Sequence, residues 1–395
     1  MSYPEIKLKR EADRRLRPGH LWVYANEIDG KPAQLGLAPG SLVSVRAADG
    51  SLYGVGHFNP NALIAIRLLS RRERSIDAAF YGERLRAALA LRERLGYAQH
   101  GRLLHGESDG VPGLVLDRYG EVLVGQLNTA GLDAQREAIA EAIGEVLQPA
   151  ALVWRNDASV RELEGLSRGS EVAFGSLPEA VYADEAGLRF RIDPLAGQKT
   201  GWFYDQRDNR LAFRRLLPGA KVLDVFSYAG GWSVHALAAG ARSVLSVDAS
   251  AKALAEAADN AALNGHGGAW EERQGDAFEV LRELKAAGES FDAVVVDPPA
   301  FIKRRKDYDE GLLAYRRINE AAMRLLRPGG WLASCSCSHH LPTEALVEVV
   351  ARGARRAQLE LRIIAMLGQS ADHPIHPAMP ETAYLKGLIA EATPT

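Results

Sequence analysis

Cysteine is almost absent from this chain, which has only Cys335 and Cys337 among its 395 residues. Two cysteines cannot build the disulfide framework of a small secreted domain, and a disulfide between residues this close would be strained. The scarcity of cysteine therefore favours a reducing, cytoplasmic location. It leaves open what two thiols separated by a single serine are for.

Long apolar runs are also missing. No segment approaches the roughly 20 consecutive apolar residues of a membrane-spanning helix. Residues 1–19 are polar and basic and lack the apolar core of a secretory signal. We therefore expect a globular protein with no membrane partner.

The chain as a whole has no large excess of either charge sign, since its net charge is −2. Residues 1–75 nevertheless carry 12 Lys and Arg against 7 Asp and Glu, a balance of +5, which leaves −7 for the remainder. A basic N-terminal region on an acidic body indicates a polyanionic partner such as RNA, although a solvated charged surface would give the same count. The candidate RNA contacts here are Arg14, Arg15, Arg17, His20 and the arginine-rich segment 71–74.

The order of the patterns predicts three domains, because 395 residues are too many for one ordinary core. Residues 1–75 are rich in strand patterns, including a hairpin that turns at Asp49-Gly50. Residues 76–192 mix helix and strand patterns in an α+β order. From 193 to 395 strands and helices alternate strictly, which predicts an α/β domain with a doubly wound parallel sheet.

The loop after the first strand of this alternation has the parts of a nucleoside site. Ligands of such sheets bind beyond the carboxyl ends of the strands, and Gly230 in "LDVFSYAGGWSVHAL" permits a close backbone approach. Asp224 beside this loop would repel a pyrophosphate but could pair with the amino group of a methionine moiety. Asp248 ends the next strand, where it could bind ribose hydroxyls, and Asp276 follows the third, near an adenine. The pattern favours S-adenosylmethionine over a dinucleotide, while a simple helix-packing turn is the alternative.

The fourth strand ends in "VVVDPPAF", residues 294–301. Asp297 would lie at the same ligand edge as the glycine loop. Pro298 and Pro299 lack backbone donors and stiffen the loop, so a planar base edge could be held there. An ordinary strand stop would also explain an Asp-Pro pair.

The motifs "LDVFSYAGG", "SVDAS", "GDAF", "DPPAF" and "SCSCS" occur in the order used by class I S-adenosylmethionine-dependent methyltransferases. More narrowly, the chain resembles the 23S rRNA (cytosine-5-)-methyltransferase family that places a PUA domain before the catalytic domain. "GHLWVYANEI", "ESDGVPGLVLDRYG" and "GQKTGWFYDQRDNR" extend the resemblance over nearly the whole chain. It implies a Rossmann-like methyltransferase sheet, S-adenosylmethionine as cofactor and large-subunit rRNA as partner, and it is compatible with a homodimer.

The resemblance also implies roles for individual residues. The residues expected to bind the cofactor are Asp224, Phe226, Ser227, Gly230, Asp248, Asp276, Gln206, Tyr204 and Pro298. Further residues would line the mouth of the site, where we expect RNA contacts from Lys199 and Arg210.

The two cysteines receive different interpretations. A zinc site built from Cys335, Cys337, His339 and His340 would crowd its ligands into six residues, so we expect no metal. Cys335 lies inside a predicted strand and is most simply a packed side chain. Cys337 lies at the end of that strand, beside the strand of Asp297, and the resemblance assigns it the catalytic thiol.

Methylation at C5 of cytosine explains why a thiol is needed. That carbon is not nucleophilic in the intact ring, but addition of a thiolate at C6 makes it so. The predicted function is methyl transfer from S-adenosylmethionine to C5 of a 23S rRNA cytosine, with Cys337 and Asp297 as catalytic residues and the base flipped out of its stack. The alternatives are a guanine-nitrogen rRNA methyltransferase, which needs no thiol, and a non-catalytic RNA-binding assembly factor.

Overall fold

The computed structural model describes residues 3–395, and the chain divides into two compact units. The first unit contains Met1–Ala183, Ile192–Tyr204 and Ala371–Thr382, and the second contains Asp184–Arg191, Asp205–Ser370 and Ala383–Thr395. The division therefore differs from a simple boundary at 192/193, because short segments of the later chain pack with the first unit. The sequence carries no local sign of such an exchange.

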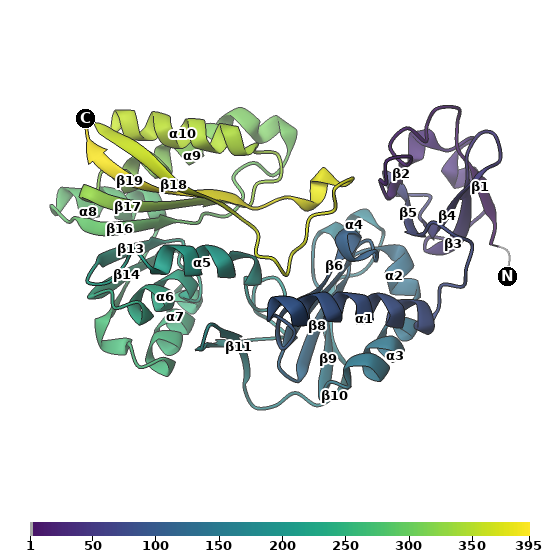
Figure 1. Cartoon of the computed structure of the whole chain (residues 1–395), viewed down its shortest axis with the longest axis horizontal. Helices are drawn as coiled ribbons and strands as arrows, with labels where there is room; N and C mark the ends of the chain where they lie inside the picture. The colour runs from purple at the N-terminus through teal and green to yellow at the C-terminus, as the bar shows by residue number, and fades with distance from the viewer. Residues whose placement is uncertain (1–2) are drawn as a thin grey trace. The chain divides into compact units, whose positions relative to one another are not determined.

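The N-terminal part of the first unit is a five-stranded sheet in the order β1-β3-β4-β5-β2, drawn in purple in Figure 1. Its strands are β1 (Glu5–Lys7), β2 (Trp22–Tyr24), β3 (Ser41–Arg46), β4 (Leu52–Phe58) and β5 (Ile64–Ser70). The predicted hairpin is confirmed, since β3 and β4 are antiparallel and Gly50 takes a φ of +89° in the turn between them. The core of this sheet is aliphatic and aromatic, with Val43, Phe58 and Ile66 fully buried.

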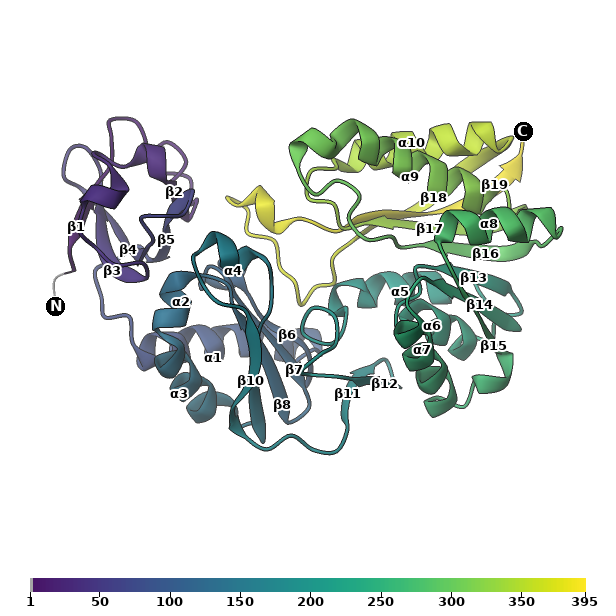
Figure 2. The same cartoon turned by 180° about the vertical axis from the view of Figure 1, so that it is seen from behind.

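The second part of the first unit is a five-stranded sheet in the order β10-β9-β8-β7-β6 with helices packed on it (Figure 2). The strands are β6 (His100–His105), β7 (Leu114–Tyr119), β8 (Val122–Leu127), β9 (Ala151–Asn156) and β10 (Gly169–Gly175). The helices are α1 (Ala78–Leu95), α2 (Ala130–Ala134), α3 (Arg136–Leu147) and α4 (Val160–Leu163). Helix α1 begins after the Asp77 cap and ends at Leu95, because Gly96 adopts a left-handed conformation.

The second unit is built on a seven-stranded sheet in the order β15-β14-β13-β16-β17-β19-β18. The strands are β13 (Lys221–Val225), β14 (Ser243–Asp248), β15 (Trp270–Gln274), β16 (Phe291–Val296), β17 (Leu326–Ser336), β18 (Leu359–Gly368) and β19 (Lys386–Pro394). The first five are parallel, and β19 is antiparallel to both of its neighbours. The predicted doubly wound sheet is therefore confirmed. A small hairpin, β11 (Val181–Glu185) and β12 (Leu188–Ile192), precedes this sheet in the chain.

Helices cover both faces of this sheet (Figures 1 and 2). One face carries α5 (Arg207–Arg214), α6 (Gly231–Ala238) and α7 (Ala251–Leu263), and the other carries α8 (Ala277–Ala286), α9 (Tyr308–Met323) and α10 (Thr343–Arg356). Because β13 and β16 are parallel, the loops that follow them leave the same edge of the sheet, and the strand order reverses between these two strands. This switch point is where open α/β sheets bind their ligands.

None of the helices in the described part of the chain, residues 3–395, is long and apolar enough to cross a bilayer.

Candidate active site

The loop after β13 is held in an unusual conformation. Phe226 and Tyr228 have φ values of +67° and +46°, which side-chain-bearing residues rarely adopt. The backbone N–H groups of Phe226 and Ser227 both donate to the carbonyl of Val247, at 2.8 and 3.1 Å. Gly230 has a φ of +80°, and a Cβ there would lie 3.0 Å from that of Ala257. The loop is thus clamped between two strands and a helix, as expected of a preformed ligand site.

Asp224 supplies a buried acid directly beneath this loop. Its side chain is fully buried, and one carboxylate oxygen accepts a 2.6 Å hydrogen bond from Ser233 Oγ. The other oxygen, Oδ1, is buried with no hydrogen-bond partner, and so is Ser227 Oγ. Burial raises the pKa of Asp224 to about 7, and the nearby charges of Asp297 and Asp248 act in the same direction. An ammonium group would satisfy the orphaned oxygen, so these residues fit the methionine end of S-adenosylmethionine.

Asp248 and Asp276 lie where the sequence predicts, at the ends of the second and third strands of the winding. Asp248 Oδ2 accepts the backbone N–H of Tyr228 at 3.0 Å, which ties the loop to β14. Asp276 is the N-cap of α8 and accepts from the backbone N–H groups of Phe278 and Glu279 at 2.9 and 3.2 Å. Both carboxylates are held by backbone donors, which gives each a structural role besides its predicted contact with ribose or adenine.

Asp297 is oriented by two side chains. Gln206 Nε2 donates to both of its carboxylate oxygens at 2.9 Å, and Trp232 Nε1 donates to Oδ2 at 3.0 Å. Asn209 Nδ2 in turn donates to Gln206 Oε1 at 2.6 Å, which fixes the orientation of that amide. Trp232 and Asn209 escaped the sequence analysis, although Trp232 directly follows the glycine pair and could have been suspected.

The two thiols occupy different environments. Cys335 is fully buried within β17, and burial raises the pKa of its thiol well above the ordinary value. Cys337 follows the last residue of β17 and is half-buried. Because β17 pairs with β16, Cys337 and Asp297 follow adjacent strands at the same edge. The part of the chain from residue 3 to 395 contains no cluster of potential metal ligands that includes either thiol.

A hydrogen-bonded frame holds the residues on both sides of Cys337. Ser336 Oγ donates to the hydroxyl of Tyr315 at 2.7 Å, and that hydroxyl also contacts Ser338 Oγ at 2.8 Å. Lys386 Nζ donates to the carbonyl of Ser338 at 2.7 Å. Burial lowers the pKa of Lys386, and the negative charge of a Cys337 thiolate opposes this effect. The same attraction stabilises the thiolate, so Lys386 is a functional candidate that sequence reasoning missed.

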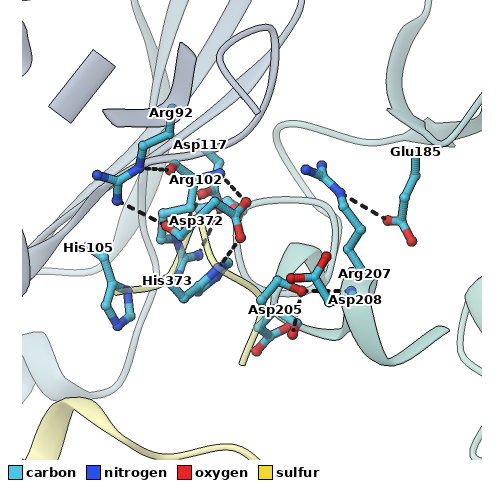
Figure 3. Close-up of polar contacts among 12 residues, drawn as sticks. Arg92, Arg102, His105, Asp117, Glu185, Asp205, Arg207, Asp208, Asp372 and His373 are labelled. Carbon is cyan, nitrogen blue, oxygen red and sulfur yellow. Dashed lines mark hydrogen bonds and ion pairs between the residues drawn. The ribbon is translucent and has the colours of Figure 1, made fainter. Parts of the chain in front are cut away.

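Arg210 does not match its predicted role. Its guanidinium is buried and makes a two-pronged ion pair with Glu185, with both distances 2.7 Å. Arg210 and His235 hold the pKa of Glu185 well below its ordinary value, against the effect of burial. Arg207 lies at the edge of this pair, 4.0 Å from Glu185 (Figure 3). The prediction that Arg210 binds RNA is therefore corrected, because its charge is used inside the second unit.

His20 is also internal. It is buried, its Nδ1 accepts the backbone N–H of Trp22 at 3.1 Å, and the two rings meet edge to face. Burial and the charge of Arg15 lower the pKa of His20, so it is mostly neutral near pH 7. These contacts indicate a packing role in the first unit and correct the prediction of an RNA-binding imidazole.

The three arginines of the same region stay candidates for RNA binding. Arg14 is exposed. Arg15 donates to Glu27 at 2.7 Å, and Arg17 donates to Asp13 at 2.9 Å, but both keep exposed guanidinium surface. Acidic partners on two of the three weaken the case for a dense phosphate-binding patch.

Lys199 and Tyr204 belong to the first unit. Lys199 has a φ of +51°, and its ammonium lies 4.1 Å from the centre of the Phe203 ring. Tyr204 is buried, stacks on Tyr119 at 5.3 Å and donates to the carbonyl of Arg118 at 3.1 Å. Their parts in cofactor or RNA binding stay predictions.

Comparison with known proteins agrees with this geometry. Residues 169–389 match the model of an S-adenosylmethionine-dependent methyltransferase family, and residues 6–71 match a PUA-like domain. The chain is 38% identical to the "Ribosomal RNA large subunit methyltransferase I" of Shewanella denitrificans, with 98% of each chain covered. It is 37% identical to the protein of the same name from Erwinia tasmaniensis, covering 96% of this chain and 97% of the relative.

The fold has counterparts among solved structures. A Streptococcus mutans protein described as a SAM-dependent methyltransferase superposes with a TM-score of 0.83 at 17% identity, over 98% of this chain and all of that chain. A second similar structure is described as a methyltransferase complexed with SAH, the demethylated cofactor. It superposes with a TM-score of 0.84 at 17% identity, over 99% of this chain and all of that chain. The protein uses S-adenosylmethionine, and it belongs to the family of S-adenosylmethionine-dependent methyltransferases with a PUA-like domain that includes the ribosomal RNA large subunit methyltransferases I.

Proposed function

We propose that this enzyme methylates C5 of a cytosine in 23S rRNA through a covalent adduct between Cys337 and C6 of the base. The observation that carries the proposal is the half-buried thiol at the ligand edge of the sheet, on the strand next to that of Asp297. The relatives named large-subunit rRNA methyltransferases support the substrate class. A cytoplasmic location and a homodimer stay predictions from the sequence.

The first step is addition of the Cys337 thiolate to C6. The sulfur supplies the electron pair of the new S–C6 bond, and the C5–C6 double bond opens toward C5 and the ring. The Lys386 ammonium favours the thiolate before addition, and the contacts of Ser336 and Ser338 with Tyr315 position it. Asp297, whose carboxyl group is fixed by Gln206 and Trp232, would accept an N–H from the N4 amino group of the cytosine and, when it carries a proton, donate to N3, which stabilises the electron-rich ring.

The second step restores the aromatic ring. S-adenosylmethionine supplies an electrophilic methyl carbon when bound. C5 forms the new carbon–carbon bond to this methyl group, the methyl–sulfur bond breaks, and its electron pair stays on the departing S-adenosylhomocysteine. A base or water then removes the proton from C5. The electron pair of that C–H bond rebuilds the C5–C6 double bond, and the S–C6 bond breaks with its electrons returning to Cys337. The thiol is thus regenerated and no other reactant is consumed.

The test is methyl transfer into unmodified large-subunit rRNA, with the methylated nucleoside identified by mass spectrometry. We expect 5-methylcytidine, a loss of about a thousandfold or more in Cys337→Ala, and activity within a few-fold of wild type in Cys335→Ala. RNA with 5-fluorocytidine at the target should trap the adduct, because the fluorine cannot leave as a proton.

Three outcomes would overturn the proposal. A methylated guanine, with Cys337→Ala fully active, would select the guanine-nitrogen reaction. Loss of activity in Cys335→Ala alone would show that the other thiol is the nucleophile. A protein that binds S-adenosylmethionine and rRNA but methylates neither base would be an assembly factor.

A further inference from the structure

A basic groove lies between α8 and α9 on one face of the second unit. It has a volume of about 600 Å³. Six cationic side chains line it, namely those of Arg282, Lys285, Arg316, Arg317, Arg324 and Arg356. Glu320 is the single carboxylate among its lining residues. This concentration of positive charge stands out because the chain beyond residue 75 has a net charge of −7.

Most of this charge is not neutralised by the protein. Arg324 pairs with Glu320 at 2.8 Å, and Lys285 Nζ donates to the carbonyl of Arg324 at 2.8 Å. The side chains of Arg282 and Arg317 are exposed and make no hydrogen bond or ion pair with any residue from 3 to 395. The charge of the groove is therefore available to an anionic ligand.

Arg316 gives independent evidence for a ligand. Its side chain is only partly exposed, and its Nε is buried without a hydrogen-bond partner. A buried guanidinium N–H that is left unpaired costs free energy, which an anionic oxygen at the groove would recover.

Helix α9 runs from the catalytic edge of the second unit to the groove. The loop from Lys303 to Lys306 consists of four exposed cationic residues and lies between the Asp-Pro-Pro turn and the start of α9 at Tyr308. Arg316 lies about 12 Å along the helix axis from Tyr308, at about 1.5 Å per residue. Cationic side chains thus lie at both ends of this stretch of α9, near the edge that holds Cys337 and at the groove, all within the second unit.

We infer that this groove binds the phosphodiester backbone of the substrate RNA at a distance from the target nucleotide. Arginine forks match phosphate oxygens, and backbone contacts of this kind position RNA without reading its sequence. The inference rests on the proposed function for the identity of the RNA. It gives the second unit an RNA-binding surface of its own, in addition to the PUA-like part.

The test uses the full-length double variant Arg282→Gln/Arg317→Gln. Its matched control is Arg215→Gln, which removes an exposed arginine at the end of α5 on the opposite face of the sheet. Binding to unmodified large-subunit RNA is measured over a series of salt concentrations. Loss of two phosphate contacts should weaken binding about tenfold near physiological salt and reduce the log–log salt slope by about one to two units. KM for RNA should rise while kcat stays unchanged.

An unchanged affinity and salt slope in the double variant, or equal losses in the Arg215→Gln control, would overturn the inference. An acidic protein retained by the wild type but not by the double variant, together with unchanged RNA binding, would assign the groove to a protein partner instead. Salt-dependent binding of an unrelated single-stranded RNA serves as a separate readout. If the wild type methylates no rRNA but the double variant still loses this binding, the proposed function fails and the groove assignment stands.

Discussion

In the first unit, Asp117 accepts two N–H groups from Arg102 at 2.8 Å, and Asp109 accepts two from Arg92 at 2.6 and 2.7 Å. Asp372 joins them by accepting the backbone N–H of Arg102 at 2.9 Å (Figure 3). At the cofactor edge of the second unit, Asp224 is equally buried but accepts from the hydroxyl of Ser233 in place of an arginine.

The difference separates two uses of a buried acid. A carboxylate with an arginine partner is a fixed part of the fold, and breaking the pair leaves an uncompensated charge. Asp224 has no arginine partner among residues 3–395, so its ionised form destabilises the site without cofactor and is available to a cationic ligand. Glu185 pairs with Arg210 within the second unit. Whether a buried acid has an arginine partner therefore depends on its place in the fold and not on the unit to which it belongs.

The largest expected effect comes from breaking a compensated pair. Arg102→Met keeps much of the side-chain volume but leaves Asp117 buried without its cation, so we expect a loss of about 3–5 kcal/mol in the free energy of unfolding of the first unit. Denaturant titration measures it. The double variant Arg102→Met/Asp117→Leu should recover most of this loss, and a single variant as stable as wild type would break the comparison.

An intermediate effect is expected where the charge is not compensated. Asp224→Asn removes the negative charge but keeps an oxygen that can accept from Ser233. We expect S-adenosylmethionine to bind roughly tenfold to hundredfold more weakly, as measured by calorimetry, while the protein without cofactor becomes more stable. Weaker binding together with reduced stability would show that Asp224 is an ordinary structural residue.

The same variant has a pH signature. The pKa of Asp224 is raised from 3.8 to about 7 in the folded protein, so the folded state keeps this proton to a higher pH than the unfolded chain does. The free energy of unfolding should therefore fall as the pH rises from about 4 to about 7, and this contribution should vanish in Asp224→Asn. Cofactor affinity should rise over the same pH range in the wild type alone.

The smallest effect is expected from an exposed ion pair, in contrast to the buried pair of Arg102 and Asp117. Arg168 and Glu162 form an ion pair at 3.1 Å in the first unit, with about half of each side chain exposed. Because solvent screens such a pair, Arg168→Gln should change the free energy of unfolding by no more than about 0.5 kcal/mol. A loss as large as that of Arg102→Met would show that burial does not distinguish the two pairs.

Much of the candidate site was predictable because its residues follow strand ends. Hydrophobic runs locate the strands, and the acids Asp224, Asp248 and Asp297 come at or directly after them. The placement of Cys337 beyond a strand and of Cys335 within it was predictable for the same reason. The contacts of these residues were not predictable, since Trp232 and Gln206 reach Asp297 across 65 and 91 positions of the chain.

The sequence by itself determined the alternation of strands and helices, the acids at the strand ends and the single thiol beyond the sheet, because these depend on local pattern and on chain order. Only the tertiary structure decided which charges are compensated. Arg210 was expected to bind RNA and instead neutralises Glu185, while six cations of α8, α9 and α10 converge on one groove. The physical reason is that compensation of a charge depends on distance and burial, and both are set by packing between residues far apart in the chain.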